Sequence, residues 1–469
     1  MKLRSDIKAD DPTKAMRRAA LLVATFSSFF TPFMGSSVNI ALPSIASEFS
    51  LDAVNLNWVA TSFLLTAAVF IVPFGRLADI YGRKRIFTLG IAVFTVSCLM
   101  VAVSTSGVWL ISSRVLQGFG SAILSGTSMA ILTSVYPAQE RGKVLGFQVA
   151  AVYTGLSLGP SIGGLLTQHF GWRSIFIFGL PLGIITIILT LWKLRGEWAE
   201  AKGERFDIVG SVIYGVGLIA IMVGFSRLPQ LMGVWFLLIG IAGITAFILW
   251  EKRVTSPVLN VKLFSLNAVF AFSNLAALIN YSATNAVSFL LSLYLQYIKG
   301  FSPQYAGLVL ITQPVMMAIL SPIAGRLSDK FEPRLLASIG MAVTTSGLVM
   351  LIFVNEGTNL VFIVVTLFIL GIGFALFSSP NSNAVMSSVD RRYYGVASGT
   401  LGTMRLIGQM LSLGIAMLLF ALYMGQVQIT PEFYPLFLRS AHTGFIVFAV
   451  LCFGGVFASL LKRKASTGQ

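Results

Sequence analysis

Long apolar runs follow one another along this chain, and their succession limits what it can fold into. Fourteen runs of about 20 or more mostly apolar residues are expected, each long enough to cross a bilayer as a helix. Charged residues make up only 11% of the 469 positions, against roughly a quarter in a soluble domain. This excludes a soluble fold and predicts an all-α integral membrane protein with 14 transmembrane helices. The expected spans are about 19–43, 54–75, 86–106, 108–135, 143–168, 172–192, 208–226, 230–250, 267–297, 303–325, 334–354, 359–385, 394–424 and 440–461.

The basic residues predict how these helices are oriented. A net charge of +16 would favour nucleic acid as the partner of a soluble protein, but most Lys and Arg here lie in the short gaps between apolar runs. With both termini assigned to the cytoplasm, 27 basic residues lie in cytoplasmic segments and only four, Arg173, Arg227, Lys299 and Arg439, on the other face. This bias predicts a multi-pass protein of a prokaryotic-type cell membrane with cytoplasmic termini. We expect it to contact the lipid bilayer, to bind no nucleic acid and to be a monomer.

A short motif recurs within the chain. GRLAD at 75–79, after the second span, returns as GRLSD at 325–329 after the tenth, 250 residues and eight spans later. Duplicated halves are typical of transporters, in which two similar bundles rock around a site between them. A duplication of six spans would place the second copy six spans later, so 208–226 and 230–250 are expected to be an inserted hairpin. The predicted parts are a cytoplasmic tail (1–18), a six-helix bundle (19–192), a cytoplasmic linker (193–207), two extra helices (208–250), a second linker (251–266), a second six-helix bundle (267–461) and a cytoplasmic tail (462–469).

Several motifs resemble those of the major facilitator superfamily. The stretch 75–85, GRLADIYGRKR, is similar to the signature that this family carries between its second and third spans. RVLQGFG at 114–120 and GLSLGPSIGG at 155–164 agree in order and position, and the latter is similar to the family's antiporter signature. The resemblance covers essentially the whole chain and indicates the fourteen-span drug:proton antiporter branch. It implies a major facilitator fold of two six-helix bundles plus two linker helices.

Both copies of the repeated motif are candidates for a conformational latch on the cytoplasmic side. In the first copy, Gly75 and Gly82 permit a tight turn, and Asp79 can face a helix N-terminus or a basic neighbour. Arg83 completes the candidate latch, and the resemblance implies a partner near Arg391 and Arg392. The alternative is a solvated turn that only obeys the positive-inside rule. The second copy keeps Gly325 and Asp329 but has Glu332-Pro333 where the first has Gly82-Arg83, so a weaker latch is expected there.

The fifth span carries glycines at intervals of four residues. Gly155, Gly159 and Gly163 therefore share one helix face, where a neighbouring backbone can approach closely, and Pro160 removes one backbone donor and can bend the helix. The resemblance implies that this motif, which ends at Gly164, packs against span 303–325 and seals the external side of the pathway. Generic packing of small residues is the alternative.

Two arginines fall within predicted spans. An arginine near the centre of a bilayer is costly, by about 2.5 kcal/mol or more, so it usually faces a cavity or a partner. Arg114 and Gln117 are three residues apart on one helix face, and Arg405 lies near the middle of the thirteenth span. Each arginine either supplies a counter-charge to a substrate or ties neighbouring helices together through their backbone carbonyls.

No carboxylate is found where a proton-coupled exporter is expected to hold one. Such a carrier needs an acidic group in a low-dielectric cavity, yet every Asp and Glu falls in a loop, a tail or a span end. Aligning NIALP at 39–43 with the family's first span places Met34 where this branch usually has Asp. Coupling through a carboxylate at the rim, coupling through the substrate's own ionisation, and proton-independent transport of anionic amphiphiles all stay open.

The resemblance and these residues predict a secondary active exporter of small hydrophobic or amphiphilic compounds, coupled to protons and working by alternating access. The alternatives are a facilitator or exporter of anionic or lipid-like amphiphiles that uses Arg114, and a non-transporting receptor or scaffold. We expect no enzyme activity, cofactor or metal, because no phosphate-binding loop, metal-spaced cluster or nucleophile beside a base occurs. The candidates for substrate binding or coupling are Met34, Asn39, Phe63, Arg114, Gln117, Tyr153, Asn280, Asn285, Gln313, Asn381 and Arg405.

Overall fold

The computed structural model describes residues 12–194, 196–254, 257–259, 261, 264–265, 267–389, 394–425 and 427–460. Within these residues, 14 helical segments are long and apolar enough to cross a membrane, which confirms the predicted number of spans. A helix satisfies all of its backbone hydrogen bonds internally, and this is the condition that a lipid environment imposes.

The helices follow one another with short connections. They are α1 (Pro12–Phe49), α2 (Ala53–Tyr81), α3 (Arg83–Ala102), α4 (Gly107–Val135), α5 (Ala138–Phe170), α6 (Arg173–Lys193), α7 (Ile208–Arg227), α8 (Leu231–Glu251), α10 (Ala268–Leu293), α11 (Pro303–Leu310), α12 (Thr312–Lys330), α13 (Pro333–Ile352), α14 (Leu360–Ser387), α15 (Tyr394–Tyr423) and α16 (Tyr434–Leu460). The π-helical turn η1 (Tyr294–Ile298) continues α10, and the 3₁₀ turn η3 (Pro431–Phe433) precedes α16. The helices α11 and α12 together form one span.

Polar residues mark where many of these helices begin. In six helices the side chain just before the first turn accepts a hydrogen bond from a backbone N–H of that turn, as helix-capping residues do. The six residues are Asp52, Ser106, Asp207, Asn267, Ser302 and Asn359. The boundaries between spans are therefore encoded locally in the sequence.

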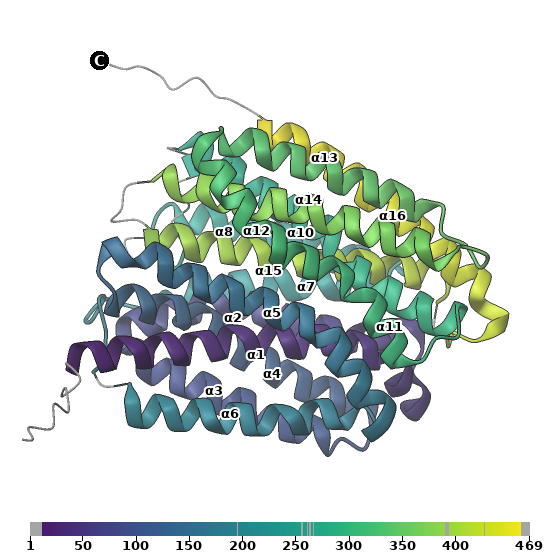
Figure 1. Cartoon of the computed structure of the whole chain (residues 1–469), viewed down its shortest axis with the longest axis horizontal. Helices are drawn as coiled ribbons and strands as arrows, with labels where there is room; N and C mark the ends of the chain where they lie inside the picture. Colours follow the sequence, from purple (N-terminus) through teal and green to yellow (C-terminus); the bar gives the residue numbers. More distant parts are fainter. Residues whose placement is uncertain are drawn as a thin grey trace, which may run out of the picture.

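The helices lie side by side in two groups with the α7–α8 hairpin added to them (Figure 1). In the first group α1 packs on α4, α5 and α6, while α4 also packs on α2 and α3; in the second, α10 packs on α15 and α16, and α14 packs on α12 and α13. The hairpin joins the bundle through α7, which packs on both α2 and α15. We call the end of the bundle where α1 begins and α16 ends the basic end, and the other the opposite end.

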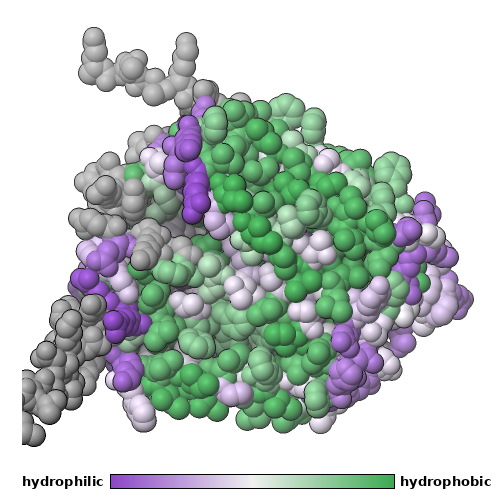
Figure 2. Space-filling model, viewed as in Figure 1, coloured by the Kyte–Doolittle hydropathy of each residue, from purple (hydrophilic) through white to green (hydrophobic). Residues whose placement is uncertain are grey.

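Hydrophobic side chains cover the middle of the face shown in Figure 2, and hydrophilic ones gather at its two ends. This pattern is the one that a lipid belt between two aqueous layers requires. Only 17% of the hydrophobic window of α8 is buried inside the protein, so this helix leaves most of its surface to lipid.

Both copies of the repeated motif lie inside helices, and the expectation of a tight turn at Gly75 is wrong. Residues 75–79 belong to the last turns of α2, and 325–329 to those of α12. At a rise of about 1.5 Å per residue, the 29 residues of α2 exceed the roughly 30 Å of the hydrocarbon core, so the helix extends beyond it. The chain turns at Gly82 instead, whose φ of 114° is a conformation that favours glycine.

The two groups meet mainly along four pairs of helices. These pairs are α1 with α10, α2 with α15, and α5 with α11 and α12. Toward the opposite end, Ser292 donates to the backbone carbonyl of Asn39 at 2.6 Å and Gln296 donates to that of Ile40 at 3.0 Å. Near the basic end, the Ser398 hydroxyl contacts the sulfur of Met129.

Candidate functional site

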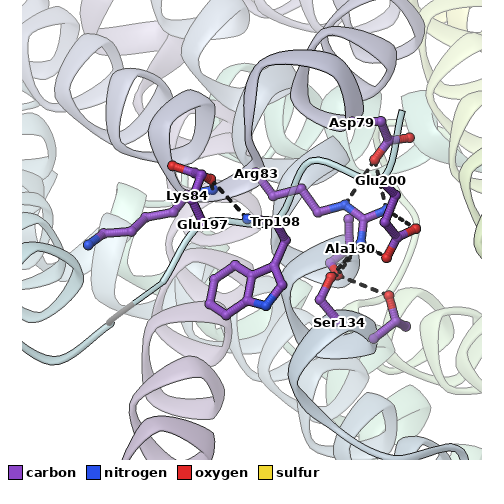
Figure 3. A network of polar contacts seen from close by, with 9 residues as sticks. Asp79, Arg83, Lys84, Ala130, Ser134, Glu197, Trp198 and Glu200 are labelled. Carbon is purple, nitrogen blue, oxygen red and sulfur yellow. Dashed lines mark hydrogen bonds and ion pairs between the residues drawn. The ribbon is translucent and has the colours of Figure 1, made fainter. Parts of the chain in front are cut away.

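Arg83, the first residue of α3, is the centre of a polar network at the basic end (Figure 3). Its Nε and Nη2 atoms lie 2.9 and 2.8 Å from Oδ1 of Asp79. Its Nη1 and Nη2 atoms donate to the two carboxylate oxygens of Glu200 at 2.8 and 2.9 Å. Nη1 also donates to the backbone carbonyl of Ala130 at 3.3 Å and to the hydroxyl of Ser134. The guanidinium is thus held between α2, α4 and the segment after α6, with 8% of its side chain exposed.

The segment after α6 makes a second set of contacts with the same turn. Glu197 accepts hydrogen bonds from the backbone N–H groups of Lys84 and Arg85 at 2.8 and 3.1 Å, where the helix dipole of α3 favours a carboxylate. Two backbone bonds tie the segment to α2 and α3, from Ala201 N to the carbonyl of Asp79 at 2.9 Å and from Arg83 N to that of Trp198 at 2.8 Å.

Glu204 extends this contact surface along α2 by pairing with Arg76. Three glutamates of this segment thus contact the corner between α2 and α3: Glu197 at the start of α3, Glu200 at Arg83 and Glu204 at Arg76. We call these three residues the linker clip. A Cβ at Gly82 would lie 2.5 Å from the carboxyl carbon of Glu197. Glycine at this position therefore provides both the positive φ and the room for the clip.

Sequence reasoning missed the linker clip, because it assigned 193–207 only to a connection between spans. The signal was present, since three glutamates at intervals of three and four residues follow a span whose neighbouring turn is basic. Asp79 lies beside a basic residue of the neighbouring turn, Arg83. The partners expected near Arg391 and Arg392 lie outside the described residues.

In the part of the chain that the structure describes, the polar contacts of the second copy are made with α14. Asn383 of α14 donates to the hydroxyl of Ser328 at 3.0 Å and approaches Oδ1 of Asp329 at 3.5 Å. Asp329 is exposed, and among the described residues it forms no ion pair within 4 Å. Pro333 stands where the first copy has Arg83, so the second copy has no guanidinium at that position.

The glycine motif of α5 faces two partners. Cβ atoms at Gly155, Gly159 and Gly163 would lie within 3 Å of Phe29, Ser36 and Ser37, which belong to α1. The expectation that these three glycines pack against span 303–325 is therefore wrong: the stripe lets α1 approach, and the Ser37 hydroxyl donates to the Gly159 carbonyl at 3.0 Å.

The other residues of that motif do face span 303–325. A Cβ at Gly164 would lie 2.5 Å from the carbonyl oxygen of Pro303, and one at Gly307 would lie 2.1 Å from that of Pro160. The close approach of α5 and α11 thus depends on a glycine from each half of the chain. This contact lies toward the opposite end of the bundle. It corresponds to the contact between the fifth span and span 303–325 that the resemblance implied.

Arg114 is enclosed within the first bundle, with 1% of its surface exposed. Its Nε donates to the backbone carbonyl of Val59 at 3.0 Å, its Nη1 donates to Gln117, and its guanidinium lies 4.4 Å from the ring centroid of Phe63. Gln117 in turn donates to the sulfur of Cys98 at 3.1 Å. This geometry matches the alternative in which the arginine ties α2, α3 and α4 together.

Met34 also faces the interior of the first bundle. It is fully buried, and its terminal methyl would lie 3.3 Å from a Cβ at Gly179 of α6. The position where related exporters are expected to carry Asp is therefore filled here by an apolar packing contact between α1 and α6.

A second polar cluster lies between the two halves near the middle of the helices. The Tyr153 hydroxyl of α5 and the Ser378 hydroxyl of α14 are 2.8 Å apart. Arg405 of α15 donates to Ser382 at 2.6 Å and lies 5.7 Å from the ring centroid of Tyr281. Its Nε is buried without a hydrogen-bond partner.

The remaining candidates are dispersed. Asn39 contributes its backbone carbonyl to the contact between α1 and α10, and Asn285 donates to the carbonyl of Gln409 at 3.3 Å. Asn280 is fully buried and neither atom of its amide has a partner. Gln313 and Asn381 are buried on α12 and α14. The described residues contain no group of His, Cys, Asp and Glu that could hold a metal ion.

A recess of about 520 Å³ lies at the opposite end, where α2, the α7–α8 loop and α15 meet. Asp52, Trp58 and Arg227 are among its lining residues, and none of the predicted substrate residues lines it. Its place at one end of the bundle separates it from the Tyr153–Arg405 cluster.

Comparisons with known proteins agree with this architecture. The family model of the Major Facilitator Superfamily matches residues 24–277 and 273–468. The riboflavin transporter RibZ of Clostridioides difficile (strain 630) is 33% identical over 388 residues, which cover 82% of this chain and 84% of that protein. The multidrug resistance protein Stp of Mycobacterium tuberculosis (strain CDC 1551 / Oshkosh) is 31% identical over 415 residues, which cover 86% and 76%.

A solved structure shares the fold at low sequence identity. It is that of a bacterial homologue of the human lysosomal transporter Spinster, in an inward-facing and unoccupied conformation. The TM-score is 0.69 at 16% identity, and the match covers 95% of this chain and 97% of that one.

Proposed function

Because the chain belongs to the major facilitator superfamily, we propose that it is a secondary active exporter of small hydrophobic or amphiphilic compounds that works by alternating access. Its relatives are transporters rather than enzymes, and they include exporters named for multidrug resistance, cephamycin and tetracenomycin C. The observation that carries the proposal is the Tyr153–Ser378 contact, which joins the two halves at mid-depth. A site between two halves is what alternating access requires.

We place the protein in the cell membrane with the basic end in the cytoplasm. In this orientation the linker clip and Asp79 form a cytoplasmic latch, and the contact of α5 with α11 seals the external side. Opening the pathway to the outside would then require Gly164 and Gly307 to separate from their neighbours. The division into an N-terminal bundle, a hairpin and a C-terminal bundle supplies the two bodies that move.

Transport by purified protein in proteoliposomes tests this proposal. A panel of cationic, neutral and anionic dyes, with riboflavin as one neutral member, would be loaded on one side and followed by fluorescence with and without a pH gradient. We expect saturable flux of at least one dye above that of protein-free vesicles. Binding without counterflow would instead support a non-transporting receptor.

Proton exchange is the coupling that the resemblance implies. Each described acidic side chain lies near a helix end or in a connection, so a proton would be carried by a rim carboxylate such as Asp79 or Asp207, or by the substrate itself. A pH-sensitive dye inside the vesicles measures the exchange. A flux that does not change with the proton gradient would refute proton coupling but would still support transport.

A second candidate is a proton-independent carrier of anionic amphiphiles. Two observations favour it. Met34 occupies the position where a titrating group is expected, and its thioether cannot carry a proton. Arg405 has no acidic partner among the described residues. The same dye panel separates the two candidates, since only this one predicts anion-selective flux without a pH gradient.

A further inference from the structure

Arg405 is a cation in the middle of the second bundle that no described carboxylate neutralises. Among the described residues its side chain makes one hydrogen bond, from Nη2 to the Ser382 hydroxyl at 2.6 Å, and its Nε is buried without a partner. An arginine at this depth is costly unless something compensates its charge. Arg114 differs, because Val59, Gln117 and the ring of Phe63 occupy its guanidinium.

We propose that Arg405, together with Tyr153 and Tyr281, binds an anionic group on a flat aromatic substrate; this inference rests on the proposed transport function. A guanidinium has five N–H donors in a planar fork that matches a carboxylate or a similar pair of oxygens. Most of these donors are uncommitted in Arg405. The group bound would be a carboxylate, a phenolate or a deprotonated imide.

The surroundings of Arg405 suit the aromatic part of such a molecule. Tyr153, Tyr281, Met317 and Phe374 form a small buried apolar cluster, with Leu156 packed against it. The rings of Tyr281 and Phe374 meet edge to face, with centroids 5.2 Å apart. Aromatic rings and a methionine bind a flat apolar body by dispersion and area burial, without strict geometry.

Both halves of the protein contribute to this cluster. Tyr153 and Leu156 come from α5, whereas Tyr281, Met317 and Phe374 come from α10, α12 and α14. A molecule bound between them would contact both bundles at once. Its binding energy could therefore differ between the two orientations of the halves, which is what coupling of binding to movement needs.

The face of α15 that leads to Arg405 is open. A Cβ at Gly402, one helical turn before Arg405, would meet no atom of the described residues within 4 Å, and the same is true at Gly399 one turn earlier. These two glycines lie between the basic end and Arg405, so a ligand that enters from the basic end has room beside the helix.

Two dyes that share one ring system test the assignment. Anionic fluorescein and a cationic rhodamine ester would be titrated against the purified full-length protein in lipid nanodiscs at mildly alkaline pH, with fluorescence polarisation as the readout. We expect Arg405→Gln to weaken fluorescein binding about ten-fold or more, the effect of losing a charge-assisted hydrogen bond, and to change rhodamine binding less than about two-fold. Arg227→Gln, at the opposite end, serves as the matched control and should leave the binding of both dyes unchanged.

Arg405→Lys is the second test variant, to be used if Arg405→Gln does not fold. Lysine keeps the charge but not the planar fork, so we expect fluorescein binding to fall by a smaller factor of about three, again without a change for rhodamine. Equal weakening of both dyes, unchanged fluorescein binding in a folded variant, or a wild-type protein that does not bind fluorescein more tightly than rhodamine would overturn the inference. Charge-selective binding without any flux would refute the proposed transport and leave the assignment of Arg405 standing.

Discussion

The two copies of the repeated motif differ in what they bind, although four of their five residues are the same. In the first copy Asp79 shares Arg83 with Glu200, and the segment after α6 covers the corner between α2 and α3. In the second copy Asp329 is exposed, and the amide of Asn383 approaches its carboxylate at 3.5 Å. The contribution of such a motif to stability therefore depends on partners outside it, and among the described residues Asp79 has a basic partner where Asp329 has an amide.

Among the described residues there is no second clip, and the second copy has no counterpart of Arg83. The residues that correspond to Gly82 and Arg83 are Glu332 and Pro333, and Pro333 begins α13. The linker clip belongs to the segment that connects the first bundle to the α7–α8 hairpin. We therefore expect the latch at the basic end to depend mainly on the first copy of the motif, and four sets of variants test this expectation.

Removing Arg83 should have the largest effect. In Arg83→Ala, Asp79 and Glu200 face each other without the guanidinium that holds them, at a cost of about 2 kcal/mol. This is below the roughly 3–5 kcal/mol of a fully buried pair, because 65% of the Glu200 side chain is exposed. We expect export to slow about ten-fold or more, together with a lower thermal unfolding midpoint. Wild-type rates in this variant would show that the network is not a latch.

Asp79→Asn tests the acidic partner of that network. We expect the turnover rate to fall about five- to ten-fold, or roughly 1–1.4 kcal/mol, while dye affinity changes by no more than a few-fold, because the latch sets the balance between conformations rather than the binding site. Initial rates and equilibrium binding in proteoliposomes measure the two quantities. Asp329→Asn is the matched variant and should slow turnover less than two-fold. Equal effects would contradict the asymmetry of the two copies.

Glu200→Gln isolates the linker clip. Since Glu200 is largely exposed, its pairing with Arg83 is screened by salt, and we expect a reduction in rate of about three-fold at low ionic strength that shrinks at high salt. Glu356→Gln, in a connection at the opposite end, is the control and should show no such salt dependence. A loss that stays constant across salt concentrations would argue for a packing role of Glu200 instead.

The glycines that begin each copy should show the smallest effects. A Cβ at Gly75 meets nothing within 4 Å, whereas one at Gly325 would lie 2.9 Å from the Ser379 hydroxyl. Because alanine also favours a helix over glycine by about 1 kcal/mol, Gly75→Ala should leave the rate unchanged or raise stability slightly. Gly325→Ala should be neutral to mildly destabilising. Thermal unfolding in detergent measures both, and a severe loss in Gly75→Ala would mean that this face closes during transport.

Much of the fold could be predicted from the sequence because it depends on local properties. Apolar runs of sufficient length form helices in lipid wherever they occur, and residues such as Asp52, Ser106 and Asn359 mark the helix starts through their own side chains. The repeated motif at 75–79 and 325–329 also predicted two similar halves, because one stretch of the sequence could be compared directly with another.

The sequence by itself thus determined the number and order of the spans and the residue types at the candidate site. Only the tertiary structure decided which groups meet: Arg83 with Glu200, Arg114 with the carbonyl of Val59, and the stripe of three glycines in α5 with α1 rather than with span 303–325. The physical reason is that helix formation follows from neighbours within a few residues. Hydrogen bonds and glycine contacts require distant segments to match within a fraction of an ångström, and no spacing along the chain encodes that match.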